Sequence, residues 1–331
     1  MTADPHTLLL QEGERSALAR DLETLPRFTV EELDGRLLDD VCARRTCLPE
    51  RMTQTLQDFA QRSSSSGALL LRGLPTDDRL PDTPRDGRPS PAKSSRVSES
   101  LLVLAGAVLG TVIGYREEKE GMVVHDVCPV PGREARQENS GSEYFEVHTE
   151  NAFHPFAPDH VLLICLRDDA GRTARTLVSP ARAALRQLPG GDEAVLRQPW
   201  FRHRMPTSFV AAGEDAAYSA PEPILTGAAD DPQMRVDAFN TTGINPEAQA
   251  ALGRFVAALR GGLDGWTLAP GDLLVVDNRR TVHARTGFTP RYDGRDRWLQ
   301  RVFTVRDFAR TRGVREGDSH VCGLPAGVRT A

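Results

Sequence analysis

The chain has 331 residues, of which 39% are hydrophobic and 26% charged, as is typical of soluble globular proteins. A formal net charge of −5, with Lys and Arg scattered along the chain, gives no reason to expect nucleic acid or a membrane as partner. The five cysteines form no Cys-x-x-Cys motif and the N-terminus lacks the pattern of a signal peptide, so we expect reduced thiols and a cytoplasmic protein.

The N-terminal part of the chain is predicted to be mainly helical. Apolar residues recur every three or four positions within 7–62, and the polar stretch SSSSG at 63–67 ends this region. ALLLRGLP at 68–75 predicts a short buried strand, and the proline-containing segment 76–97 predicts an ordered loop or a mobile surface excursion. The apolar run that follows is short for a membrane span and predicts a buried helix over 98–114.

Strands dominate the chain from residue 121 onward. The candidate strands are MVVHDV, YFEVH, HVLLICLR, ARTLVS, PEPILTG, QMRVDAF, DLLVVDN and LQRVFTVRDF. Helices are expected at 180–188, 191–197 and 246–261. Many short strands with Gly and Pro turns favour an α+β protein with a jelly-roll (double-stranded β-helix) core and helices packed outside. We expect one domain over 1–331, with the core at 68–310 and a C-terminal tail at 311–331.

Two segments carry residues that bind metals or anions. The stretch EVHTENAFHP places His148 and Glu150 at the end of a strand. Chance alone gives about one His-x-acid triplet in such a composition, so the triplet is weak evidence by itself. A second segment, 271–305, follows a buried strand with His283. Two histidines and one carboxylate can bind Fe(II) on one face of the ion and leave its other coordination positions open. The absence of a thiolate near the motif argues against a structural zinc site.

The same second segment contains Arg297 and Arg301 on a predicted strand. Residues four apart on a strand face the same side, so both guanidiniums point inward together. Buried guanidiniums are costly unless an anion meets them. A dicarboxylate and the carboxylate of an amino acid would satisfy this requirement.

Each of these residues also has a structural interpretation. His283 alone can be a satisfied core histidine, and Arg297 alone can pair with Asp293 or Asp296. The remaining nearby histidines, His154 and His160, are assigned structural roles. The combination of the triplet, the distal histidine and the arginine fourteen residues later favours the iron site.

These motifs resemble the clavaminate synthase-like branch of the Fe(II)/2-oxoglutarate-dependent oxygenases. The resemblance covers about 68–320 and is carried mainly by VHTENAFHPFAPDHVLLICLRDD and VDNRRTVHARTGFTPRYDGRDRWLQRVF. It implies that the three ligands of iron are His148, Glu150 and His283. It further implies that Arg297 and Thr176 bind 2-oxoglutarate. The substrate contacts that it implies are Arg301 for the α-carboxylate, Glu118 for the α-ammonium, Asn139 near the backbone and Asp237 for the side chain.

The resemblance implies hydroxylation of C3 or C4 of a free L-amino acid, with Fe(II), 2-oxoglutarate and O₂ as cofactor and co-substrates and with succinate and CO₂ as co-products. The branch includes hydroxylases of asparagine, arginine and lysine in peptide-antibiotic pathways. Asp237 is an acceptor and therefore calls for a donor on the substrate side chain. Some arginine hydroxylases have a second acid two residues later, where this chain has Phe239. The single acid weakens the case for a guanidinium and leaves asparagine, lysine, citrulline or a cyclic relative open. The polar segment 203–222 is predicted to be a lid over the substrate.

Several alternatives remain open. Glu118 can be an exposed charge, and Asp237 can cap a turn. The same iron centre can catalyse desaturation or oxidative cyclisation, or act on an aminoacyl group on a carrier protein. Halogenation is disfavoured because Glu150 occupies the position that a halide would need. A jelly-roll binding protein and a cupin-like metal hydrolase or isomerase are the other classes, and the protein is expected to be a monomer or a homodimer.

Overall fold

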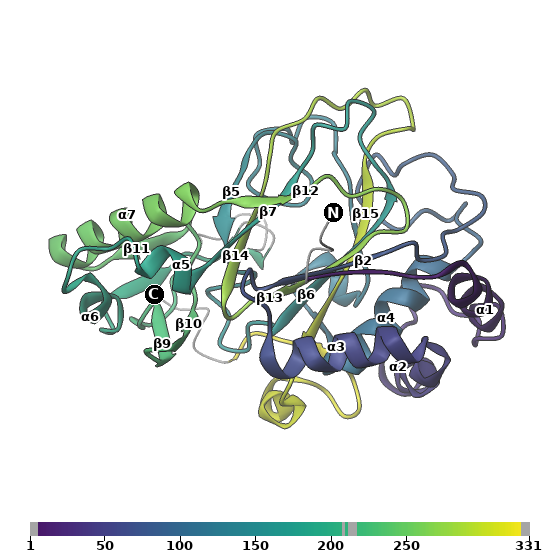
Figure 1. The fold of residues 1–331 in the computed structure, drawn as a ribbon, viewed down its shortest axis with the longest axis horizontal. Helices are drawn as coiled ribbons and strands as arrows, with labels where there is room; N and C mark the ends of the chain where they lie inside the picture. Colours follow the sequence, from purple (N-terminus) through teal and green to yellow (C-terminus); the bar gives the residue numbers. More distant parts are fainter. Residues whose placement is uncertain (1–5, 207–208, 211–216, 326–331) are drawn as a thin grey trace.

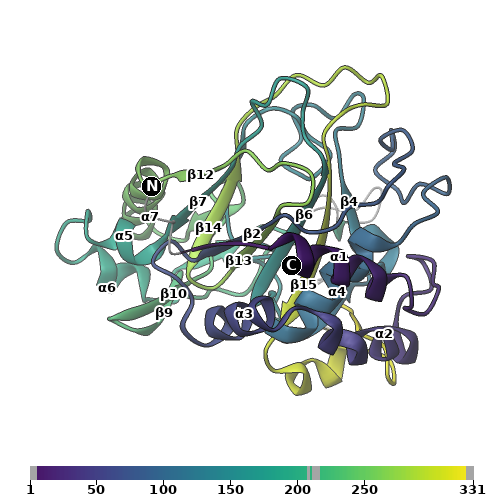
Figure 2. The same ribbon diagram turned by 45° about the vertical axis from the view of Figure 1, so that its right-hand side comes forward.

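Two β-sheets face each other at the centre of the molecule, and helices cover the outer face of each sheet (Figure 1). The computed structural model describes residues 6–206, 209–210 and 217–325. The turned view keeps the same layers, with α1 to α4 on one side and α5 to α7 on the other (Figure 2).

The larger sheet contains strands from both ends of the chain. In spatial order its strands are β1 (Thr7–Leu9), β2 (Ala68–Arg72), β13 (Leu273–Asp277), β6 (His160–Arg167), β15 (Trp298–Val305), β3 (Thr111–Tyr115) and β16 (Val321–Cys322), with β4 (His125–Val127) also paired to β15. The long central strands β6, β13 and β15 pair antiparallel, and nearly all of their residues are buried. Strands that are buried along nearly their whole length are expected where both faces of a sheet are covered.

The smaller sheet lies opposite and carries most of the chemistry-bearing strands. Its order is β12 (Asp264–Trp266), β7 (Thr176–Pro180), β14 (Thr281–Arg285) and β5 (Phe145–His148). Two short antiparallel ribbons extend from it, namely β9 (Leu225–Ala228) with β10 (Asp231–Met234) and β8 (Phe201–His203) with β11 (Thr241–Gly243).

The helices fall into two groups. Those on the larger sheet are α1 (Glu12–Leu22), α2 (Gly35–Cys42), α3 (Glu50–Arg62) and α4 (Val97–Leu109). Those on the smaller sheet are α5 (Ala181–Leu185), α6 (Asp192–Leu196) and α7 (Pro246–Gly261). Short 3₁₀ segments in the described part of the chain include η1 (Ala43–Cys47), η2 (Lys119–Gly121) and η4 (Phe308–Val314). No helix in the described ranges is both long and apolar enough to span a bilayer.

The period of two along each strand divides the core into layers. On β2, Leu69 and Leu71 pack against the helices, whereas Leu70 faces the space between the sheets. On the smaller sheet, Val178 faces the larger sheet and Leu177 faces α5 and α7. The site therefore sits in a space whose walls are fixed by two packed layers.

The predicted helix over 98–114 is wrong at its C-terminal end. Helix α4 ends at Leu109, and Thr111–Tyr115 form strand β3, which pairs with β15. A Cβ at Gly110 would lie 2.5 Å from the carbonyl oxygen of Val305, so only glycine allows this close passage. An apolar run buried on all sides has no periodicity, and the sequence alone cannot show where helix becomes strand.

The helical prediction for 7–62 also needs a correction. Thr7–Leu9 form strand β1, parallel to β2, before three helices follow. A three-residue strand is too short to display an alternating pattern. The segment 76–97 contains no helix before Val97 and no strand, as predicted, and it contributes a buried lysine to the core.

A buried network of charged and polar groups joins this segment to the outer face of β15. Lys93 Nζ lies 2.9 Å from Asp77 and 2.7 Å from Glu99. Gln300 donates to Glu99 and to Asp126, at 3.1 and 3.0 Å. The indole of Trp298 also donates to Asp126, at 2.6 Å.

We expect the Asp126→Asn variant to change how stability depends on pH. Burial raises the pKa of Asp126 to about 6, above the value near 4 of an unfolded aspartate. Its contribution to stability is therefore present at low pH and lost as pH rises from about 4 to about 6. Wild type should lose about 3 kcal/mol of unfolding free energy between pH 4 and pH 7 through this group, and the variant should not show this loss. Urea unfolding at both pH values measures this, and a pH-independent difference would contradict the assignment.

Candidate active site

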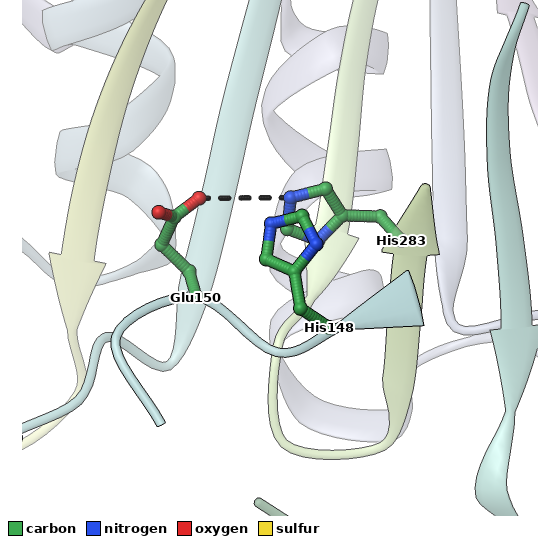
Figure 3. A group of neighbouring side chains, drawn as sticks. All are labelled: His148, Glu150 and His283. Atoms are coloured by element: carbon green, nitrogen blue, oxygen red, sulfur yellow. Dashed lines mark ion pairs between the residues drawn. The ribbon is translucent and has the colours of Figure 1, made fainter. Parts of the chain in front are cut away.

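His148, Glu150 and His283 meet at the end of the smaller sheet (Figure 3). His148 is the last residue of β5 and pairs directly with His283 on β14, so the two imidazoles lie on one face. Glu150 follows two residues later, where the chain leaves the strand. One ligand atom from each residue lies within 4.8 Å of the others, and all three side chains are buried.

Neighbouring groups fix the orientation of these ligands. Nδ1 of His148 donates to the carbonyl of Glu146 at 2.8 Å, which leaves Nε2 unprotonated and free to bind a metal. The His148 ring also stacks on Phe145, with centroids 4.3 Å apart. The backbone of Glu150 is held from both sides by Asn278, whose side-chain oxygen accepts from the amide at 2.6 Å and whose nitrogen donates to the carbonyl at 3.1 Å.

The charges of the three ligands suit a divalent metal. Burial, reinforced by the neighbouring His283, lowers the pKa of His148 to about 3. Burial opposes ionisation of Glu150, but Arg301 and the two imidazoles outweigh it and hold the pKa well below its usual range. Oε2 of Glu150 is buried without a hydrogen bond. Two imidazoles and one carboxylate form the ligand set of mononuclear Fe(II) oxygenases, so the residues fit Fe(II).

Arg297 lies immediately before β15 and lines a small cavity next to His283. Its Nη2 donates to Oγ1 of Thr176 at 3.4 Å, and its guanidinium lies 5.9 Å from the centroid of the Phe288 ring. Burial lowers the pKa of Arg297. Within the described ranges Arg297 forms no ion pair, so pairing with Asp293 or Asp296 is not found. A buried guanidinium with one hydroxyl partner can receive an anionic ligand.

Arg301 lies at the centre of a second polar cluster. Its guanidinium is buried and forms an ion pair with Glu118. Nη1 lies 2.9 Å from Glu150 and 3.2 Å from Oδ1 of Asn139, and Nη2 donates to Nδ1 of His125 at 2.9 Å. The contact with Glu150 is an ion pair without hydrogen-bond alignment. The cluster thus places a cation and an anion beside the metal ligands.

Glu118 is buried and not an exposed surface charge, although it lies in the charged stretch REEKE. Lys119, Glu120 and Gly121 follow it with positive φ angles of 48°, 59° and 82°. This tight left-handed turn reverses the chain and directs the Glu118 carboxylate toward Arg301. Asn151 donates to Glu118 at 3.4 Å, and burial raises the pKa of Glu118 against the opposing charge of Arg301.

Asp237 forms an isolated antiparallel bridge with His148 and begins a turn, so the predicted strand QMRVDAF does not continue beyond this bridge. Strand β10 ends at Met234, and Oδ1 of Asp237 accepts from the amides of Phe239 and Asn240 at 2.8 and 3.0 Å. Oδ2 accepts from the Asn240 side chain at 2.7 Å. Asp237 therefore caps a turn and also lines a cavity beside the metal ligands.

A cavity of about 300 Å³ opens beside the metal ligands. Among its lining residues are Glu118, Asn139, His148, Glu150, Asp237 and Asn240. Arg204 and Pro206, at the start of the predicted lid over 203–222, line it too. Residues 207–208 and 211–216 of that segment lie outside the described residues.

His154 and His160 stay outside this site. Nδ1 of His154 accepts from the amide of Phe156 at 3.0 Å, and Nδ1 of His160 lies 3.0 Å from Oγ1 of Thr304. Neither residue belongs to the metal-ligand group. Their structural roles are therefore as expected.

Three residues that shape the site were not among the predicted site residues. His125 reaches Arg301 because the two are paired in the β4–β15 ladder, and no local pattern signals this pairing. Asn278 holds the backbone of the metal-binding loop and directly follows β13, at the end of the predicted strand DLLVVDN. Arg285 lies two residues after His283 on β14 and thus on the same face, which strand periodicity alone indicates.

The chain is similar to known oxygenases along most of its length. The family model described as taurine catabolism dioxygenase TauD, TfdA family, matches residues 48–303. L-asparagine oxygenase of Streptomyces coelicolor is 40% identical over 276 residues, covering 83% of this chain and 82% of the relative. Clavaminate synthase 2 of Streptomyces clavuligerus is 38% identical over 311 residues, covering 92% and 93%.

Solved structures show the same architecture. A structure of asparagine oxygenase with Fe(II), (2S,3S)-3-hydroxyasparagine and succinate matches with a TM-score of 0.90 and 36% identity, over 97% of this chain and 100% of that one. A structure of the non-heme iron oxygenase OrfP with Fe, succinate and (3S)-hydroxy-L-Arg matches with a TM-score of 0.85 and 30% identity, over 96% and 99%. These matches confirm the predicted jelly-roll class with flanking helices. The chain belongs to the TauD/TfdA family of dioxygenases, within the group of iron-dependent oxygenases that includes asparagine oxygenase and clavaminate synthase.

Proposed function

We propose that this dioxygenase hydroxylates C3 or C4 of a free L-amino acid whose side chain carries a hydrogen-bond donor. The observation that carries the proposal is the buried pair of Arg301 and Glu118 beside the metal ligands. A free amino acid is a zwitterion, and a closed pocket must offer one cation and one anion to hold it.

In this proposal the pair of Arg301 and Glu118 holds the substrate by both of its charged groups. Arg301 offers its fork of N–H donors to the α-carboxylate, and Glu118 accepts from the α-ammonium. His125 keeps Arg301 in position, because Nε2 of its ring donates to the carbonyl of Met122 at 2.8 Å and Nδ1 is left to accept from the guanidinium. Burial lowers the pKa of His125 well below its usual range, so the ring stays neutral and does not repel Arg301.

The short distance between Arg301 and Glu150 limits which carbon reacts. Nη1 of Arg301 lies 2.9 Å from a ligand atom of the metal site. A substrate held there by its α-carboxylate has only its first side-chain carbons near the metal, which favours C3 and then C4. Bound Fe(II) and 2-oxoglutarate supply the O₂-dependent oxidation, in which one oxygen atom enters the C–H bond and 2-oxoglutarate becomes succinate and CO₂.

The acceptor capacity of Asp237 narrows the class of side chain. A carboxylate has about four acceptor positions, and three are filled by two amides and the Asn240 side chain. One position on Oδ2 remains for the substrate. Phe239, where some arginine hydroxylases have a second acid, is 62% exposed. This supports an amide or ammonium side chain over a guanidinium, which prefers a bidentate partner.

Two related outcomes use the same metal site. Desaturation or oxidative cyclisation would need the same placement of the substrate. A carrier-bound aminoacyl group would lack the free carboxylate that we assign to Arg301. The Arg301–Glu118 pair therefore favours a free amino acid.

All five cysteines are unpaired, which supports a reducing compartment such as the cytoplasm. Names such as clavaminate synthase among the relatives support a role in peptide natural-product biosynthesis.

The test is stimulation of succinate formation by a panel of amino acids. Fe(II) protein prepared anaerobically receives 2-oxoglutarate, one amino acid and then air. We expect asparagine or lysine, or a relative with a single terminal donor, to raise the rate at least tenfold above the rate without amino acid. We expect arginine to stimulate less. The α-amide of the stimulating amino acid is the matched control and should stimulate poorly. No stimulation by asparagine, lysine, glutamine, ornithine, citrulline or arginine would overturn the proposal.

A further inference from the structure

A second guanidinium shares the cavity that contains Arg297. Arg285 is only 6% exposed and lines the same small cavity as Arg297, Thr176 and His283. Neither guanidinium forms an ion pair with a carboxylate in the described part of the chain. Two buried cations therefore stand side by side with no protein anion to balance either of them.

The strand pattern explains why Arg285 faces this cavity. Arg285 lies two residues after His283 on β14 and therefore on the same face of the sheet. Its register partner on β7 is Thr176, whose hydroxyl accepts from Arg297. Both guanidiniums also lie near the ring of Phe288, with Cζ 5.1 Å from its centroid for Arg285 and 5.9 Å for Arg297. The two cations thus flank one hydroxyl and one aromatic ring.

The hydrogen bonds of Arg285 leave its charge uncompensated. Nη1 donates to the carbonyl of Gly141 at 2.7 Å and Nη2 to the carbonyl of Glu143 at 2.6 Å. Nε is buried and has no partner. Carbonyl dipoles satisfy donors but carry no net charge, so burial of the second cation remains unfavourable until an anion arrives.

We propose that Arg285 is a second cation of the 2-oxoglutarate site and acts with Arg297 on the distal carboxylate. Arg297 alone balances one negative charge at that end of the cavity. Arg285 strengthens the field there and increases the preference for a ligand with a charged group at C5 over one with an apolar end. The inference rests on 2-oxoglutarate as co-substrate in the proposed function, and not on which amino acid is oxidised.

A purely structural role for Arg285 makes a different prediction. Through Gly141 and Glu143, Arg285 ties the loop at 139–143 to β14, and Asn139 of that loop contacts Arg301. If tethering were its whole role, loss of Arg285 would weaken every ligand of the site to a similar extent. If its charge acts on the distal carboxylate, loss of Arg285 would weaken the binding only of ligands that carry this carboxylate.

Isothermal titration calorimetry on the anaerobic Fe(II) protein, without amino acid, separates the two roles. The ligands are 2-oxoglutarate and 2-oxopentanoate, which has the same chain length and keto acid but a methyl group at the distal end. For Arg285→Gln we expect the Kd of 2-oxoglutarate to rise about tenfold or more and that of 2-oxopentanoate to change less than about twofold. An equal change for both ligands, or none for 2-oxoglutarate, would overturn the proposal.

Arg285→Lys keeps the test informative if the glutamine variant fails to fold. Lysine retains the charge but cannot reach both carbonyls as a fork. We expect it to keep the wild-type ratio of the two Kd values within about threefold. Loss of that ratio in a folded Arg285→Lys protein would also overturn the proposal. The titration contains no amino acid, so its result does not depend on whether any amino acid stimulates succinate formation. Equally, a failed titration test would not change the outcome of the amino-acid panel.

Discussion

His148→Ala should lose both iron and turnover. The substitution removes one of three ligands and leaves Glu150 and His283, which are too few to hold Fe(II) in a site that must keep positions open. We expect bound iron below about a tenth of the wild-type content after desalting and a fall in succinate formation of about a thousandfold. Elemental analysis of the purified protein and a succinate assay measure the two effects.

His6→Ala is the matched control, because His6 is an imidazole near the N-terminus that belongs to no metal-ligand group. It should keep iron and activity. Wild-type iron content in His148→Ala would argue against the His148–Glu150–His283 site and favour a binding protein with its metal elsewhere.

Arg301→Gln should abolish productive binding of the amino acid while leaving 2-oxoglutarate binding largely intact. Removal of one member of a buried charge pair costs about 3 kcal/mol, partly because Glu118 is left without its cation. We therefore expect kcat/KM for the amino acid to fall by about two to three orders of magnitude. The Kd of 2-oxoglutarate should change less than about threefold, because that ligand is assigned to Arg297.

Two further variants sharpen this result. Glu118→Gln keeps an acceptor for the ammonium but removes its charge, so a smaller loss of about tenfold to a hundredfold is expected. Arg310→Gln removes an arginine that is more than a third exposed and lies 3.8 Å from Asp159, and it should leave kcat/KM unchanged. A similar loss of amino-acid and 2-oxoglutarate binding in Arg301→Gln would show that Arg301 supports the whole site and does not bind the substrate carboxylate selectively.

Strand periodicity predicted much of the site from the sequence. The positions of His148 and Glu150 at a strand end, and of Arg297 and Arg301 four residues apart, follow from a period of two. The same rule applied to His283 would have indicated Arg285, which was not predicted. The positions of His148, Arg297 and Arg301 were predictable because side-chain direction on a strand is a local property.

Features that depend on distant pairing could not be predicted in the same way. His125 contacts Arg301 only through the register of β4 on β15, which the local sequence does not specify. Helix α4 ends at Leu109, and the chain passes close to the backbone of Val305 at Gly110. A turn follows Asp237 because its carboxylate accepts from backbone amides that a strand would use. In each case a tertiary contact or a side-chain hydrogen bond overrides the hydrophobic pattern.

The mass of the product tests most directly whether this enzyme hydroxylates a free amino acid. The amino acid that stimulates succinate formation should be recovered with one added oxygen atom, in a ratio to succinate close to one. Tandem mass spectrometry should place the hydroxyl at C3 or C4. Recovery of a product that has lost two hydrogens would contradict hydroxylation and assign desaturation or ring closure, and an unmodified amino acid would contradict its role as the substrate.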